Sequence, residues 1–151
     1  MAAQTRQINQ LVALRMGEVW PPMLARALAT VDHIAKGRLC INIISSDMPG
    51  LKESNETRYA RASEIIRILQ ALWRTDGAFE WKGEFYNISL ATTEPAKPYQ
   101  QNGGPLMYFG GISPARILTC TAGKISTGIS SVASRLVRIS TNCASLMPSC
   151  T

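Results

Sequence analysis

The sequence of 151 residues is poor in the side chains that most metal and nucleophilic sites need. It contains one histidine, His33, and its four cysteines include no Cys-x-x-Cys pair. Structural zinc usually takes four ligands from closely spaced cysteines and histidines, so we expect no metal site. Cys40 lies in an apolar run and is better explained as a small packed side chain with a reduced thiol. A single histidine also gives no basis for a Ser/His/acid or Cys/His catalytic arrangement.

Long apolar segments are missing as well. No run approaches the ~20 apolar residues that cross a bilayer. Residues 1–10 are polar and lack the apolar stretch of a secretory signal, so we expect a cytoplasmic protein without a membrane partner. The net charge of +6 comes from scattered lysines and arginines, and without a basic cluster we do not expect a nucleic-acid partner.

What the sequence does contain is an alternation of apolar runs and helical patterns. Apolar runs at 11–14, 39–44 and 105–109 predict strands, and helical spacing predicts helices over about 22–35 and 56–73. The run at 39–44 is nearly continuous in apolar residues, as expected of a parallel strand that is covered on both faces.

Each predicted helix carries apolar residues at three- and four-residue steps. In the first helix these are Met23, Ala27, Val31 and Ile34, and in the second they are Tyr59, Ala62, Ile66, Leu69 and Trp73. Before the third strand, segments 79–81 and 84–88 flank the short turn Lys82-Gly83 and predict a β-hairpin.

Strands that alternate with helices indicate a parallel sheet. Three units cannot close a (β/α)8 barrel, which typically takes about 250 residues. We therefore predict an α/β fold, a partial (β/α)8 TIM barrel of about three βα units with a β-hairpin insertion.

Polar residues stand at or near the carboxyl ends of the predicted strands, where parallel α/β folds bind their ligands. Asn42 interrupts an apolar strand, and its amide needs a partner, either a ligand or the neighbouring strand. Arg58 and Tyr59 open the second helix, where a guanidinium beside free backbone N–H groups suits a phosphate or simply faces solvent.

A third feature follows the last predicted strand. Gly110 and Gly111 precede Ser113 at a helix start. Two glycines allow the backbone to approach a ligand closely, and the Ser hydroxyl favours an anion, although Gly-Gly also forms ordinary tight turns.

Four motifs in this order resemble the bacterial luciferase-like monooxygenases. Residues 15–34 resemble the family's Arg-x-Gly…Pro…Ala-Arg…Leu-Asp pattern, 37–45 its Gly-Arg-strand-Asn signature, and 56–59 its Glu-Arg-Tyr helix opening. Residues 105–113 are similar to the Pro-Leu-Tyr-Phe-Gly-Gly-x-Ser segment of the alkanesulfonate monooxygenase branch. The resemblance covers roughly residues 5–115.

The resemblance implies a barrel enzyme that uses FMNH2 and O2 to oxygenate a small organic, possibly organosulfur, substrate. It also implies a separate flavin reductase that supplies the FMNH2, and a homo-oligomer at full length.

By the same resemblance, Asn42 contacts the flavin ring, Arg58 and Tyr59 lie near the ribityl phosphate, and Ser113 contacts the phosphate beside Gly110 and Gly111. The catalytic histidine and substrate-binding arginines of that branch have no counterpart here. We therefore expect an internal stretch that is inactive alone. The alternative is a non-catalytic fragment that acts only through association with another chain.

The last part of the chain departs from the family pattern. Residues 117–151 contain no acidic or aromatic residue and twelve Ser or Thr, whereas all ten acidic residues lie before Arg116. We interpret residues 1–116 as a partial luciferase-like barrel and 117–151 as an aberrant tail, which predicts a change of reading frame. A genuine but divergent tail is the alternative.

Overall fold

A computed structural model of the chain describes residues 2–92, 97–101, 103–109 and 137–139. The elements in chain order are β1 (Gln10–Arg15), α1 (Pro21–Ala35), β2 (Leu39–Ile44), α2 (Asn55–Arg74), β3 (Phe79–Lys82), β4 (Asn87–Leu90), β5 (Leu106–Phe109) and β6 (Val137–Ile139). No helix in the described ranges is long and apolar enough to cross a membrane.

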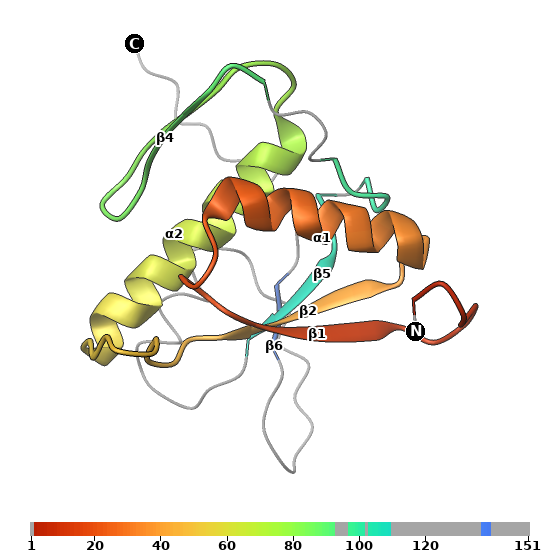
Figure 1. The fold of residues 1–151 in the computed structure, drawn as a ribbon, viewed down its shortest axis with the longest axis horizontal. Helices are drawn as coiled ribbons and strands as arrows, with labels where there is room; N and C mark the ends of the chain where they lie inside the picture. Colours follow the sequence, from red (N-terminus) through yellow and green to blue (C-terminus); the bar gives the residue numbers. More distant parts are fainter. Residues whose placement is uncertain (1, 93–96, 102, 110–136, 140–151) are drawn as a thin grey trace.

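The main sheet has the strand order β1-β2-β5-β6. β1, β2 and β5 are parallel neighbours, and the two helices lie on one side of them (Figure 1). This confirms the predicted α/β architecture of an open, partial barrel. β6 was not predicted; it pairs antiparallel with β5, whose open edge accepts a short extended segment in either direction.

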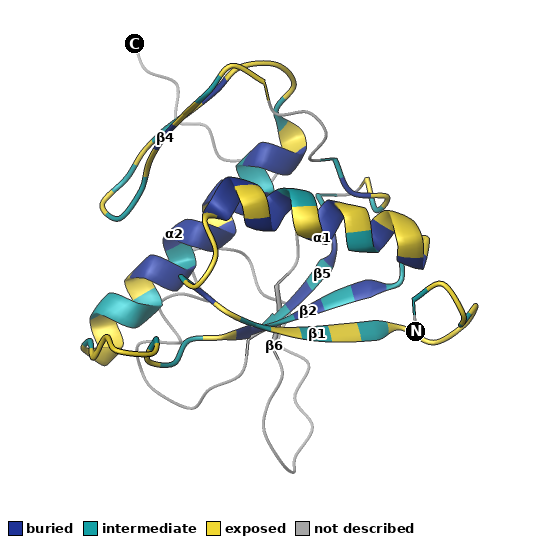
Figure 2. Ribbon diagram, in the orientation of Figure 1, coloured by how far each residue is buried: buried dark blue, intermediate teal, exposed yellow. Residues whose placement is uncertain are grey.

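The core fills the space between the helices and one face of the sheet. Leu39, Ile41 and Ile43 of β2 are almost completely buried, as are Ile65 and Leu69 of α2. The alternation of buried and accessible residues along β2 places Cys40, Asn42 and Ile44 on the opposite face, which no described helix covers (Figure 2). Cys40 and Asn42 are nevertheless half-buried, and the expectation that this strand is covered on both faces stays a prediction.

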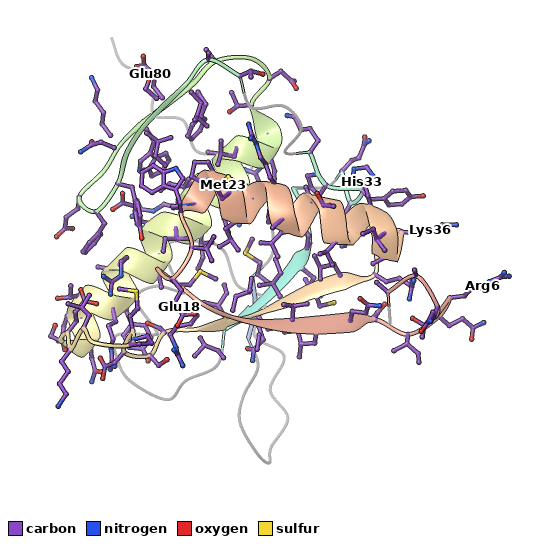
Figure 3. The ribbon with its side chains drawn as sticks, viewed as in Figure 1. Arg6, Glu18, Met23, His33, Lys36 and Glu80 are labelled. Atoms are coloured by element: carbon purple, nitrogen blue, oxygen red, sulfur yellow. The ribbon has the colours of Figure 1, made fainter. Side chains whose placement is uncertain are left out.

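The apolar residues predicted for α1 do not mark its buried face. Met23 is 56% exposed, and Figure 3 shows it on α1. Ala25 and Leu28 are buried instead. The small side chain of Ala25 brings the two helices close enough for Trp73 Nε1 to donate to the Ala25 carbonyl over 3.3 Å. In α2 the prediction holds from Ala62 to Trp73, while Tyr59 is only half-buried.

The β3–β4 hairpin is confirmed, but its turn is longer than expected. Lys82 pairs with Asn87, so residues 83–86 form the turn, closed by a 2.9 Å bond from Gly83 N to Tyr86 O. The buried carboxylate of Glu64 explains the difference. It accepts from Phe85 N and Tyr86 N at 3.0 and 3.1 Å, which draws these residues away from the ladder and onto α2.

Candidate functional site

The loops that follow β1 and β2 meet beside the first turn of α2. Arg15, the last residue of β1, donates from Nε to Ser46 Oγ at 2.9 Å and pairs through Nη1 with Glu18 at 2.6 Å. Figure 3 shows Glu18 at the end of the sheet where α2 begins. The carboxyl ends of two parallel strands are thus joined by side-chain contacts, at the edge where such folds place their ligands.

Asn42 lies on the sheet face that faces away from the helices. Its backbone neighbours are Ala13 of β1 and Tyr108 of β5. The side-chain Oδ1 atom is buried and has no hydrogen-bond partner among the described residues. Of the two alternatives left by the sequence, a bond from a neighbouring strand to this oxygen is not seen. An orphaned acceptor of this kind costs free energy unless a ligand or water meets it.

A second orphaned acceptor lies three residues further on. Ser45 Oγ is buried, and no partner for it occurs within the described ranges. Ser45 is not among the site residues predicted from the sequence. The available signal was the position of Ser45 and Ser46, two hydroxyls placed directly after the last residue of an apolar parallel strand.

Arg58 lies in the first turn of α2, whose N-cap is Ser54. The Ser54 hydroxyl accepts from Thr57 N at 3.2 Å and anchors the helix start. Arg58 Nη1 forms an ion pair with Asp47 at 2.7 Å, and Nη2 donates to Asn55 Oδ1. Arg58 Nε is buried and has no partner in the part of the chain that is described. The predicted phosphate-binding cation is therefore present at the loop after β2, and an internal carboxylate engages it.

The first turn of α2 also holds a carboxylate. Hydrogen bonds from the Glu56 backbone N–H and from the Ser54 side chain lower the pKa of Glu56, with a smaller contribution from the Arg58 charge. A lowered pKa at this exposed position indicates that the helix start favours negative charge, in keeping with the helix dipole.

The other predicted site residues divide into two groups. Tyr59 lines a cleft of about 460 Å³ between α2 and the hairpin, together with Trp81 and Phe85. Gly110, Gly111 and Ser113 lie outside the described residues. Asn42 lies in β2, and Arg58 lies beside the loop that follows β2. No hydrogen bond joins these two residues in the described part.

A buried ion pair fastens the loop after β2 to α2. Arg61 Nη1 donates to Glu53 Oε1 at 2.8 Å, and Nη2 pairs with the second carboxylate oxygen. The Arg61 guanidinium also lies 5.9 Å from the centre of the Phe85 ring. The same loop also packs against Gly17, which lies between β1 and α1. A Cβ on Gly17 would stand 2.9 Å from Met48 Sδ of the loop. The Arg61–Glu53 ion pair, which we call the Arg61–Glu53 clamp, was not predicted from the sequence, because neither partner stands in a recognisable motif.

Two buried acceptors and the guanidinium of Arg58 at a helix start suit a ligand that combines a polar ring with an anionic group. The described residues contain no group of three or more His, Cys, Asp or Glu side chains that could hold a metal ion. At this edge the described residues offer hydrogen-bonding groups, the Arg58 cation and the carboxylates of Glu18 and Asp47.

Comparison with known proteins gives a consistent match. A family model of the luciferase-like monooxygenases matches residues 1–128. A sulfoquinovose monooxygenase from Agrobacterium fabrum is 50% identical over 116 residues, which cover 77% of this chain and 30% of that protein. An FMNH2-dependent dimethylsulfone monooxygenase from Pseudomonas fluorescens is 32% identical over 122 residues, covering 76% and 32%.

A solved structure agrees on the fold. An EDTA monooxygenase from a Chelativorans species superposes with a TM-score of 0.66 at 18% identity, covering 76% of this chain and 32% of that one. The chain spans about a third of the length of the curated relatives it matches, at 30% and 32% in the two cases above. The alkanesulfonate branch named by the sequence motifs stays a prediction, because these two relatives are named for other sulfur compounds.

Proposed function

Because the chain belongs to the luciferase-like monooxygenase family, we propose that its β1, β2 and β5 strands with their loops form one wall of an FMN site. The fit rests chiefly on one observation. Asn42 Oδ1 and Ser45 Oγ are buried acceptors without partners among the described residues; Asn42 lies within β2 and Ser45 directly follows it. Reduced FMN carries polar ring atoms that donate hydrogen bonds and a phosphate that suits Arg58.

Each residue has a distinct role in this proposal. Asn42 orients the flavin ring, while Arg58, with Gly110, Gly111 and Ser113, holds the phosphate, and Tyr59 borders the phosphate end. Bound FMNH2 supplies the two electrons with which O2 delivers one oxygen atom to a substrate and the other to water. The catalytic residues that act on the substrate lie outside this set.

The relatives define the proposed substrate class. Both proteins compared above act by name on organosulfur compounds, one on sulfoquinovose and one on dimethylsulfone. We infer a small organosulfur substrate for the complete barrel, with FMNH2 supplied by a separate reductase. The described part of the chain supplies part of one site, so we expect no turnover from this chain by itself.

A chimera tests the proposal. Residues 10–109 would replace the matching segment of the Agrobacterium sulfoquinovose monooxygenase, and FMN binding would be followed by titration. We expect Arg58→Ala to weaken FMN binding by about 10- to 150-fold, because a charge-assisted bond is worth roughly 1.5–3 kcal/mol. Arg67→Ala, an exposed arginine of the same helix, is the matched control. Normal FMN affinity in a folded Arg58→Ala chimera would refute the phosphate assignment.

A second candidate function has an observation of its own. Leu11 of β1 is 52% exposed on the sheet face opposite the helices, and β1 forms an outer edge of the sheet in the described residues. A free parallel edge beside apolar side chains favours pairing with another chain. In this alternative the chain acts only by association. Binding of FMN by the chimera but not by a self-associated chain would favour the first proposal.

A further inference from the structure

The Arg58–Asp47 ion pair occupies the cation on which the proposed flavin site depends. Asp47 follows β2 by three residues, and its Oδ1 lies 2.7 Å from Arg58 Nη1. Asn55 engages Nη2, and the remaining donor Nε is buried. A guanidinium binds phosphate best through two parallel N–H groups. Both terminal nitrogens of Arg58 already donate to an acceptor. A phosphate therefore has to displace Asp47 or Asn55, or share a nitrogen with one of them.

We propose that Asp47 competes with the phosphate of the flavin for Arg58 and thereby limits how strongly the site prefers FMN over flavins without a phosphate. The proposal rests on the proposed function, since it presumes that Arg58 meets the phosphate. Asp47 neutralises Arg58 in the ligand-free protein and yields to the phosphate on binding. A flavin without a phosphate does not displace Asp47 and leaves the ion pair intact.

The environment of Asp47 allows it to yield. Its side chain is 49% exposed, whereas that of Arg58 is 18% exposed. A half-exposed carboxylate regains its water shell when it leaves the pair, so the exchange costs little. Arg58 is the more confined partner, because its backbone N donates to Ser54 O within the helix and its side chain is largely buried. The mobile partner of the pair is therefore the carboxylate.

The neighbouring Glu53–Arg61 ion pair is one that we do not expect to exchange with a ligand. Both side chains are largely buried, and Arg61 meets Glu53 through two nitrogens. Separating them would strand a charge away from water, which is costly. The same loop thus carries one fixed pair that holds it to α2 and one exchangeable pair at the proposed phosphate position.

The negative charge of Asp47 makes its effect specific to a flavin that carries a phosphate. A phosphate that approaches Arg58 meets the negative charge of Asp47 at close range, and this repulsion adds to the competition. Removing the charge while keeping the shape, as in Asp47→Asn, relieves both effects. Asn55 is neutral, so removing its side chain relieves only one hydrogen bond and should have the smaller effect.

The test is a fluorescence titration of the chimera described above with FMN and, separately, with riboflavin at low salt. We expect Asp47→Asn to tighten FMN binding by about 2- to 10-fold and to leave riboflavin binding unchanged, in line with the modest strength of exposed ion pairs. Asn55→Ala should tighten FMN binding less. Asp76→Asn is the matched control. Asp76 is an exposed acid in an ion pair with Lys97, outside the proposed site, so this substitution should change neither titration.

The outcomes separate the two proposals. If Arg58→Ala weakens FMN binding but Asp47→Asn leaves it unchanged or weakens it, Asp47 is not a competitor and the flavin site stands. If Asp47→Asn tightens both flavins equally, the effect is not directed at the phosphate and the inference is wrong. If Arg58→Ala has no effect, or if FMN and riboflavin bind alike to the unsubstituted chimera, the phosphate site itself is refuted and the inference with it. No flavin binding by the chimera would count against both.

Discussion

The two faces of the β1-β2-β5 sheet differ in how completely they are packed. On the helix side, Ile41 is fully buried among residues of α1 and α2, whereas on the other side Ile44 of the same strand is 36% exposed. On the side opposite the helices, the buried Asn42 Oδ1 has no hydrogen-bond partner among the described residues. The helix-facing side of this sheet is therefore the better packed one, and the opposite side is the one that we propose for ligand binding.

The largest expected effect tests this comparison within one strand. Ile41→Ala should lower the free energy of unfolding by about 2–5 kcal/mol, because it leaves a cavity between sheet and helices. Ile44→Ala removes the same atoms from the opposite face and should cost less than about 1 kcal/mol. Urea unfolding followed by tryptophan fluorescence would measure both at one protein concentration. Equal losses would mean that the two faces are packed alike.

A buried polar contact should give the next largest effect. Asp32 is fully buried in α1 and accepts from Gln100 N at 2.9 Å and Gln100 Nε2 at 2.8 Å. Gln100 Nε2 also donates to Leu39 O at 3.0 Å, which ties residues 97–101 to both α1 and β2. Asp32→Ala leaves these donors poorly satisfied and should cost about 1–3 kcal/mol in the same unfolding assay. Asp76→Ala, at an exposed carboxylate, should have almost no effect.

The fold could be predicted largely because periodicity reports which residues are apolar. The bounds of β2 agree with the prediction, and α2 differs by one residue at each end. The buried face of α1 was missed because its packing depends on small residues such as Ala25, which carry little apolar signal. The hairpin turn was misjudged because Glu64, some twenty residues away, fixes its backbone, and local turn rules do not include such contacts.

The candidate site was less predictable than the fold. Asn42 stands out in the sequence as a polar residue in an apolar strand, and its orphaned oxygen supports that interpretation. Arg58 was proposed from its place at a helix start, but its engagement by Asp47 depends on the path of a loop. Ser45 and the Arg61–Glu53 clamp were missed for the same reason, since loop geometry is set by tertiary contacts rather than by local pattern.

The accessible face should also govern self-association. We expect the isolated chain to associate, because Leu11 and Ile44 present apolar surface beside an open strand edge. Leu11→Lys combined with Ile44→Lys should shift the chain toward monomer in light scattering. Ile8→Lys places the same charge on an exposed residue outside the sheet and should have little effect. A monodisperse monomer from the unsubstituted chain would contradict the expectation.

The smallest expected effect is the contribution of Tyr86 to the pH dependence of stability. Burial raises the pKa of Tyr86, the Arg61 charge opposes this, and Glu64 adds to it. The folded state therefore holds the phenol proton more tightly than the unfolded state. The resulting stabilisation is fully present below the unfolded pKa of about 10 and is lost as the pH rises through the higher folded pKa. Tyr86→Phe should remove this part of the alkaline loss in urea unfolding, while Tyr99→Phe, at an exposed ring, should not.

Asn42→Ala in the chimera tests whether the sheet face opposite the helices meets the flavin ring. FMN affinity and product formed per FMNH2 consumed would be measured side by side, with Asn87→Ala in the exposed hairpin as the control. We predict that Asn42→Ala lowers product yield by about 5- to 10-fold and changes FMN affinity by less, because the ring loses one hydrogen-bond partner and the phosphate contacts remain. Unchanged product yield in a folded Asn42→Ala chimera would contradict the claim.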